Sequence, residues 1–321
     1  MSDYTKLKGI QHIGDVLLSK TLETNIITYF NWGLLEVGGF FNVSIPSPGV
    51  YGGDQHKLRL VSEDPYYSTG QVWEGFRSDW VWETGVEYDY QPIRVSGVNV
   101  DGTFYPTATT TGTYAHKINY PLGRVTFDNA IPPTSVVTCE HSYRYVHFTH
   151  GGVPWWRQIQ TNSMRGDDVH FLQQGSGAWS ILAQNRIQLP AVIVEATPRT
   201  SRRPYEIGST RAWVRQDVLF HVLADNPDDV KFLHDAITYQ WQKQFFLFDL
   251  NRMFQDEKFP LDAGGSPVTG AMMYPQLVAP TGEGGYRWNI VSTANMQSTD
   301  ASMPGSIWAT TIRGTFELDL P

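Results

Sequence analysis

The stretch LPAVIVEATPRTSRRPYEIGSTRAWVRQDVLFHVLADNPDDVKFLHDAI, residues 189–237, contains the clearest structural pattern of the chain. Its first part, 189–196, is a short apolar run that predicts a buried strand. A polar excursion interrupted by prolines follows over 197–210, and 211–224 predict a long strand that returns beside the first. The stretch therefore predicts a hairpin whose connection projects from the body of the protein.

A helix is predicted directly after this hairpin. Asn226 is suited to the N-cap, Pro227 to the first helical position, and the two acidic residues that follow favour the positive end of the helix dipole. Further on, FFLFDLN (245–251) predicts a buried strand, and TIRGTFELDL (311–320) predicts a terminal strand with alternating faces. We therefore expect residues 151–321 to form an α+β core domain, with helices packed on a mixed sheet.

The first 85 residues are expected to belong to the same main domain. Leu18, Leu22, Ile26, Tyr29 and Phe30 follow the spacing of an amphipathic helix, which should stop near Gly33 or at Gly38-Gly39. The irregular stretch after it contains GQVWEGFRSDWVWETG, residues 70–85. Its indoles have two interpretations, as ordinary core side chains or as anchors in a subunit interface. We carry Trp73, Trp80 and Trp82 forward as candidate interface residues.

Residues 86–150 predict an antiparallel β module inserted into this domain. Asp101-Gly102 is a dipeptide typical of two-residue hairpin turns, and a strand is expected over 124–128. Residues 137–147 alternate in the two-residue period of a single long strand.

Composition restricts the classes of function. Among 321 residues the aromatic share is 13% and the charged share 17%, which favours an ordered protein with surface suited to partners. A net charge of −8 argues against a protein that grips nucleic acid through phosphates. Cys139 is the one cysteine, so no internal disulfide is possible. No apolar run approaches the length of a membrane span, and we expect no membrane partner.

Residues suited to catalysis or metal binding do not form a recognised motif. His147 and His150 would point to opposite faces of one strand, and His141 lies too far from His147 to share an ion with it. Cys139 falls inside a predicted strand, where a thiol is inert. Carboxylate pairs leave a sugar-cleaving enzyme open in principle. We expect no enzymatic activity, no metal and no cofactor.

A cluster of arginines is the one local charge anomaly of this acidic chain. Arg199, Arg202 and Arg203 lie on the predicted excursion, with Tyr205 beside them. One interpretation is a solvated hairpin tip. The other is a projecting arm that docks on an acidic neighbouring subunit, where arginine offers several directional donors. We take these four residues as candidate interface residues.

Two passages are similar to structural proteins of tailed bacteriophages. Residues 189–237 resemble the core of neck and tail-completion proteins, particularly tail terminators, in which a hairpin with a protruding loop leads into a strand and a helix. INYPLGRVTFDNAIPPTSVVTCEHSYRYV (118–146) resembles β modules of virion proteins. Simple terminators are much shorter than this chain, so the Trp-rich segment and the β module would be additions.

The resemblance implies a structural virion protein that assembles in the host cytoplasm. Its expected form is a homo-oligomeric ring, typically a hexamer, that caps the tail tube and meets the head-side stopper or connector. Its partners would be its own copies together with tail tube and sheath proteins, and genomic DNA would pass through the bore without specific binding. Two alternatives remain open. The first is another neck protein: a head–tail stopper, a head-completion protein or a connector. The second, from a different class, is a carbohydrate-binding tail adhesin that uses the clustered tryptophans.

Overall fold

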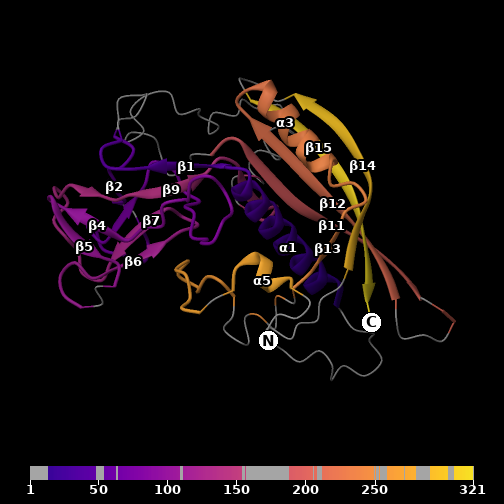
Figure 1. Cartoon of the computed structure of the whole chain (residues 1–321), viewed down its shortest axis with the longest axis horizontal. Coiled ribbons are helices and arrows are strands. Elements are labelled where there is room, and N and C mark those ends of the chain that lie inside the picture. Colours follow the sequence, from indigo (N-terminus) through magenta and orange to yellow (C-terminus); the bar gives the residue numbers. More distant parts are fainter. Residues whose placement is uncertain are drawn as a thin grey trace.

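A computed structural model describes most of the chain, in two bodies of different architecture (Figure 1). The described residues are 14–47, 54–62, 64–108, 111–153, 156, 188–204, 206–207, 212–248, 250, 253, 259–270, 272–279, 290–302 and 307–320. Within them, only the backbone is described at 14–18, 198–200, 202, 212, 290, 292–302 and 319–320.

The larger body is built on a six-stranded sheet in the order β10-β11-β12-β15-β14-β13. β10 and β11 run parallel, and the remaining neighbours are antiparallel. The sheet is therefore mixed, which confirms the α+β class; the terminator-like arrangement stays a prediction. The strands are β10 (His147–His150), β11 (Ala191–Pro204), β12 (Ala212–Ala224), β13 (Gln244–Phe246), β14 (Ile290–Ser302) and β15 (Trp308–Leu320).

Helices α1 (Gly14–Glu36) and α3 (Pro227–Thr238) pack on the same face of this sheet. Leu22 and Ile26 of α1 and Leu233 and Ile237 of α3 belong to one buried cluster with the even-numbered residues of β12, Val214 to Val222. Side chains alternate along a strand, so the odd-numbered residues of β12 point to the opposite face. Neither α1 nor α3 covers that second face, which we call the uncovered face, and a smaller buried cluster around Trp156, Ile193 and Leu223 packs on one end of it.

The predicted start of α3 is confirmed. The Asn226 side chain accepts a hydrogen bond from the Asp229 backbone N–H at 2.8 Å, and Pro227 occupies the first turn. Of the two predicted ends of α1, the second is confirmed, because the helix passes Gly33 and ends at Glu36, just before Gly38 with its φ of 80°. A glycine inside a helix costs about 1 kcal/mol. Full burial of Leu35 against Phe40 is worth more, at about 2 kcal/mol, so the helix continues.

The smaller body is a β module that lies between α1 and β10 in the sequence. Its sheets have the orders β2-β3-β7-β6, β5-β4-β8 and β1-β9. The strands are β1 (Phe40–Val43), β2 (Arg59–Leu60), β3 (Val72–Glu74), β4 (Gly97–Val100), β5 (Thr103–Pro106), β6 (His116–Asn119), β7 (Arg124–Phe127), β8 (Val137–Thr138) and β9 (His141–Arg144). Figure 1 shows the module beside the large sheet, with α1 between them.

Two predicted boundaries therefore change. The Trp-rich segment was assigned to the main domain, but β3 pairs with β2 and β7, so this segment belongs to the module. The alternating run 137–147 was predicted as one strand and is divided into β8, β9 and the start of β10, which lie in three sheets. All four residues of β9 are buried, so alternation there does not separate a core face from a solvent face. The Asp101-Gly102 turn is confirmed, with φ of 51° and 84°.

Candidate interaction surface

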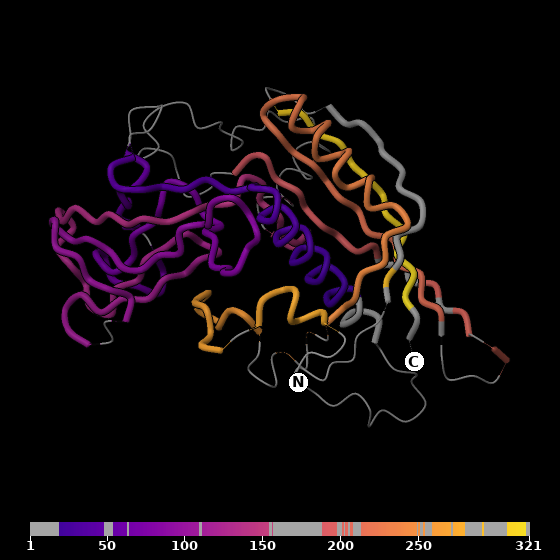
Figure 2. The backbone as a smooth tube through the Cα atoms, in the orientation of Figure 1, coloured from indigo at the N-terminus to yellow at the C-terminus, as the bar shows by residue number. Residues whose placement is uncertain are grey.

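The distal part of the β11–β12 hairpin lies at one end of the sheet, where β15 accompanies β12 as far as the pair Ala212 and Leu320. The two strands pair from Ala191 and Leu223 to Pro204 and Ala212, with a register shift between Ala196 and Thr200. Most of the predicted polar excursion is therefore strand. Figures 1 and 2 show the two strands leaving the body beside the C-terminal end of the chain. Ile207, near the tip, is fully exposed. We define the arm as residues 200–204 and 212–216.

The structure describes the predicted arm residues to different extents. Arg203 is exposed at the end of β11, opposite Trp213 of β12. The backbones of Arg199 and Arg202 lie in β11, but their side chains are outside the described residues. Tyr205 lies outside the described residues altogether. The arm thus presents Arg203 to solvent, and the projection of the connection between its strands stays a prediction.

A shallow hollow of about 310 Å³ lies on the uncovered face of the arm. Ser201 and Arg203 line it from β11, Trp213 and Arg215 from β12, and Glu317 from β15. Trp213 keeps 43% of its surface exposed, although indoles are on average highly buried; Trp308 of β15 is also exposed. Sequence reasoning missed Trp213 and Arg215. The signal was present, because the two-residue period of 211–224 puts both on the face opposite the buried valines.

Charged pairs continue from this hollow along the uncovered face. Arg215 pairs with Glu317 across the strands, with Nε 2.9 Å from the carboxylate. Asp217 accepts from Arg313 Nε at 3.1 Å and from the Thr315 hydroxyl at 2.7 Å. Exposed pairs of this kind add only about 0.2–1 kcal/mol each to stability. They give the face an ordered set of donors and acceptors that a neighbouring protein can contact.

The outer edge of β11 is poorly suited to pairing with another strand. Among the described strands, β10 is the one that covers this edge, and it reaches only from Ala191 to Val194. Beyond that point the register shift and Pro204, which has no N–H, interrupt the row of backbone groups. Bulges, prolines and charges are common means of preventing edge-to-edge association. Any contact of the arm with a partner would therefore use its side chains and not its backbone edge.

The candidate tryptophans lie in the core of the module, which corrects the interface assignment for two of them. Trp80 is fully buried, stacks on His141 with ring centroids 4.3 Å apart, and donates to the Arg77 carbonyl at 2.8 Å. Trp73 is 3% exposed and donates to the Gly70 carbonyl at 3.1 Å. Neither indole reaches a surface that a neighbour or a sugar could contact. Trp82 is partly buried against the same core.

A buried ionic cluster joins the module to the larger body. The Arg144 guanidinium pairs with Asp79 at 3.2 Å and with Glu83, and His147 Nδ1 lies 3.0 Å from Asp79. Burial opposes ionisation of Asp79, but the His147 hydrogen bond and the Arg144 charge outweigh it and lower the pKa of this carboxyl. Each partner has its counter-charge in place. The cluster therefore holds β9, β10 and the Trp-rich segment together.

Cys139 and His141 are neighbours but lack the properties of a catalytic pair. The sulfur lies 3.6 Å from His141 Nδ1, and both residues are fully buried. Burial raises the pKa of the Cys139 thiol and lowers the pKa of His141 to about 4. Both groups are therefore neutral at pH 7, and the thiol is not a nucleophile. Among the described residues, no group of three His, Cys, Asp or Glu side chains is arranged to hold a metal ion.

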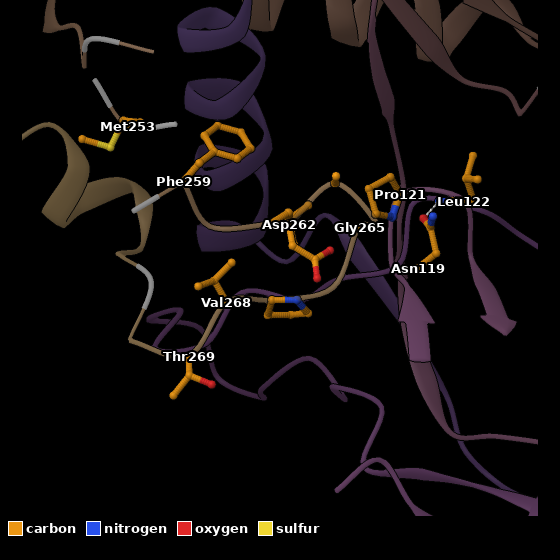
Figure 3. A pocket seen from close by; sticks show the side chains of 12 residues that line it. Asn119, Pro121, Leu122, Met253, Phe259, Asp262, Gly265, Val268 and Thr269 are labelled. Atoms are coloured by element: carbon orange, nitrogen blue, oxygen red, sulfur yellow. Dashed lines mark hydrogen bonds between the residues drawn. The ribbon is translucent and has the colours of Figure 1, made fainter. Parts of the chain in front are cut away.

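A cavity of about 940 Å³ lies between the turn after β6 and the loop 259–270 (Figure 3). Its polar side chains serve the turns that carry them. Asp262 accepts from the backbone of Gly264 at 2.8 Å and of Ser266 at 2.9 Å, and Asn119 accepts from the Leu122 backbone at 3.0 Å. Apolar side chains, including Phe259 and Val268 of the loop, supply much of the remaining lining. The cavity thus lacks the convergent polar groups of a substrate site among its described residues.

Comparison with known proteins gives no family for this chain. No protein-family model matches it, and no curated protein is similar in sequence. In the part of the chain that the structure describes, no helix is long and apolar enough to cross a membrane. The arm is therefore the candidate site that stands on the geometry of the chain itself.

Proposed function

We propose that this protein is a non-enzymatic structural subunit that assembles with its own copies into a ring in the neck of a tailed phage. In this position the ring terminates the tail tube and joins it to the head-side connector. The observation that carries the proposal is the arm, the end of a paired hairpin that presents Arg203 and Trp213 together.

The chemistry of the arm supports a protein partner. Tryptophan and arginine are the residues that most often dominate binding energy in protein interfaces. Both can lose their exposed surface on association, and Arg203 can form directional hydrogen bonds to a carboxylate. A solvated hairpin tip, the other interpretation of the sequence, gives no reason for an indole to remain 43% exposed.

The charge of the chain supports a bore through which DNA moves. A net charge of −8 disfavours tight phosphate contacts and lets a polyanion pass without being held. The same acidity supplies surfaces on which a basic arm can dock. A ring of this kind needs no catalytic group, and its function is to seal and connect.

The proposal is tested by the assembly state of the purified protein. Multi-angle light scattering after size exclusion, followed by negative-stain microscopy, should show one closed ring with a central hole. A protein that stays a monomer at concentrations of about 100 μM, where subunits of a stable assembly are bound, contradicts the proposal. Added tail tubes and portal-bearing heads then separate the two neck positions. A terminator binds the tube ends, and a stopper, which would also be a ring, binds the heads.

The adhesin alternative predicts binding of glycans through exposed indoles. Its two proposed contact residues were Trp80 and Trp82, and Trp80 has no exposed surface. No observation on the described residues favours this alternative over a ring.

A further inference from the structure

The solvent side of α3 has an arrangement that core packing does not explain. Asp228, Phe232, Asp235 and Tyr239 follow one another at spacings of four, three and four residues, so they form one stripe along the helix. Phe232 is 53% exposed and Tyr239 is 89% exposed. The buried side of the same helix is carried by Leu233 and Ile237. We call these four residues the α3 stripe.

The two acids of the α3 stripe are available to a partner. The Asp228 side chain is 90% exposed, and its neighbour Lys231 lies 3.4 Å away in a solvated pair. The Asp235 side chain is 74% exposed, and the ring of His234 beside it lies 3.4 Å away. Exposed pairs at this distance are worth little, so each carboxylate can exchange its neighbour for a stronger one. Trp241, 56% exposed just beyond the helix, extends the aromatic part of the surface.

The arm is complementary to this stripe in both charge and kind of side chain. Arg203 and Trp213 are exposed side by side on the arm, where Arg215 also lines the hollow. The arm thus combines cations with an indole, and the stripe combines carboxylates with aromatic rings. Opposite charges set register and partner choice, while rings supply buried apolar area.

The two surfaces cannot meet within one copy of the chain. Val214 of β12 is buried against the helices, so Trp213 and Arg215, its neighbours in the strand, point to the other face of the sheet. The α3 stripe lies on the outside of the helical layer. A sheet and a helix therefore separate the surfaces, as the positions of α3 and of the strand ends in Figure 1 show. Contact between them therefore joins two copies of the chain, and a head-to-tail contact of this kind builds a ring when the rotation closes.

We propose that the arm of one subunit docks on the α3 stripe of the next, with Arg203 facing the carboxylates of Asp228 and Asp235 and with Trp213 packed against Phe232 and Tyr239. This inference rests on the proposed ring and names the two surfaces that join its subunits. The partner is a second copy of this chain. The contact is heterologous, so each subunit uses its arm on one side and its α3 stripe on the other.

Charge reversal tests the pairing of the two surfaces. One variant carries Arg203→Glu and Arg215→Glu in the arm, and a second carries Asp228→Lys and Asp235→Lys in the stripe. Each alone should weaken assembly by about tenfold or more in apparent dissociation constant, because like charges then face each other. The quadruple variant should regain assembly, and so should a mixture of the two double variants, whose reversed surfaces are complementary.

Matched controls place the same charges elsewhere on the exposed surface. Lys117→Glu controls for lost positive charge, and Asp89→Lys with Asp128→Lys controls for lost negative charge; all three residues are exposed on the β module. These variants should assemble as the unchanged protein does. Thermal melting of every variant as a monomer at low concentration distinguishes lost contact from lost folding. A double variant that melts early is replaced by Arg203→Glu or Asp235→Lys alone.

The outcomes separate the two proposals. If the unchanged protein forms a ring and either reversed variant assembles equally well, the arm does not dock on α3, although the ring stands. If both reversed variants fail and neither the quadruple variant nor the mixture recovers, the two surfaces do not face each other. If the unchanged protein forms no ring, the proposed function itself fails. Recovery in the mixture supports the inference, because two proteins that are separately inactive have to supply one surface each.

Discussion

Arg203 of β11 lies directly opposite Trp213 of β12 near the end of the arm, and both are exposed. An arginine and an indole held next to each other by strand register keep their relative position without help from a partner. Less conformational freedom is then lost when a partner binds, and this lowers the cost of association. The arm is thus preorganised for contact, whereas a flexible basic loop with the same residues would not be.

Removing the arm's charge should weaken assembly and leave the protomer intact. We predict that Arg202→Ala with Arg203→Ala reduces the affinity between subunits by about tenfold, since charged contacts in an interface typically contribute on that scale. Light scattering across a concentration series measures this change. Circular dichroism of the variant should match that of the unchanged protein, because Arg203 is exposed. Normal particles from the double variant would show that the arm is a solvated tip.

Trp213 is expected to matter for assembly more than for folding. Trp213→Ala should weaken subunit association on the order of thirtyfold, the effect of an interface side chain worth about 2 kcal/mol. Its effect on the free energy of unfolding should stay within about 1 kcal/mol, as the indole is already 43% exposed. Urea denaturation at low concentration and light scattering at high concentration measure the two quantities separately.

Trp80→Ala is the matched comparison, since it removes the same ring from a buried place. The loss of a fully buried indole should cost about 3–5 kcal/mol of stability through the cavity that it leaves. If Trp213→Ala were the more destabilising of the two and left assembly unchanged, the division between interface and core tryptophans would be wrong.

This contrast also shows what the sequence could not determine. The hairpin, the cap of α3 and the Asp101-Gly102 turn depend on local rules, and they were predictable. The burial of Trp80 depends on β-module strands far away in the sequence. The spacing of the aromatic residues around Trp80 does not show which distant strands will cover it. β14 was missed because Ile290–Ser302 is mostly polar after Val291 and has no aromatic residue, so the apolar alternation that signals a strand is weak.

The segment 245–251 illustrates the same limit on a smaller scale. It was predicted as a buried strand, and only Gln244–Phe246 is strand. The chain then leaves the sheet because Asn25 of α1 binds it instead. The Asn25 side chain accepts from the Phe248 N–H at 2.9 Å and donates to the Phe248 carbonyl at 3.0 Å. A buried amide more than two hundred residues away thus takes both backbone groups that a strand would have used.

The stability of the β module should fall as the solution becomes acidic. Burial lowers the pKa of His141 to about 4, whereas an exposed histidine in the unfolded chain titrates near 6.5. The unfolded chain therefore binds the proton first, and stability that is present above about pH 6.5 decreases as the pH falls toward 4. Burial also lowers the pKa of His221, in the large sheet, to about 4. This histidine should therefore add to the loss of stability over the same pH range.

Urea denaturation at several pH values measures this dependence. The His141→Gln variant, which cannot be protonated, should show a smaller loss of stability between pH 6.5 and 4 than the unchanged protein. The slope of unfolding free energy against pH should be smaller in the variant than in the unchanged protein. The difference should approach about 1.4 kcal/mol per pH unit, the value for one proton. An equal slope in the His141 variant would mean that this imidazole does not stay neutral.

Engineered cysteines should trap the contact between arm and α3 covalently. Cys139 is the one natural cysteine and is buried, with a raised thiol pKa, so its background reactivity should be low. In a variant with Arg203→Cys and Asp235→Cys, mild oxidation should link each subunit to the next. Non-reducing electrophoresis should then show a ladder that ends at the number of subunits in the ring, because closure leaves no free cysteine.

The two single-cysteine variants decide what such a ladder means. In a head-to-tail contact, Arg203 of one copy does not meet Arg203 of another, so each single variant should stay largely monomeric on the gel. An equal mixture of the two should give dimers and no longer species, because each chain then has one reactive partner. Dimers from a single variant alone would instead indicate a two-fold contact between like surfaces, in which each surface is satisfied by its own copy and no ring can grow.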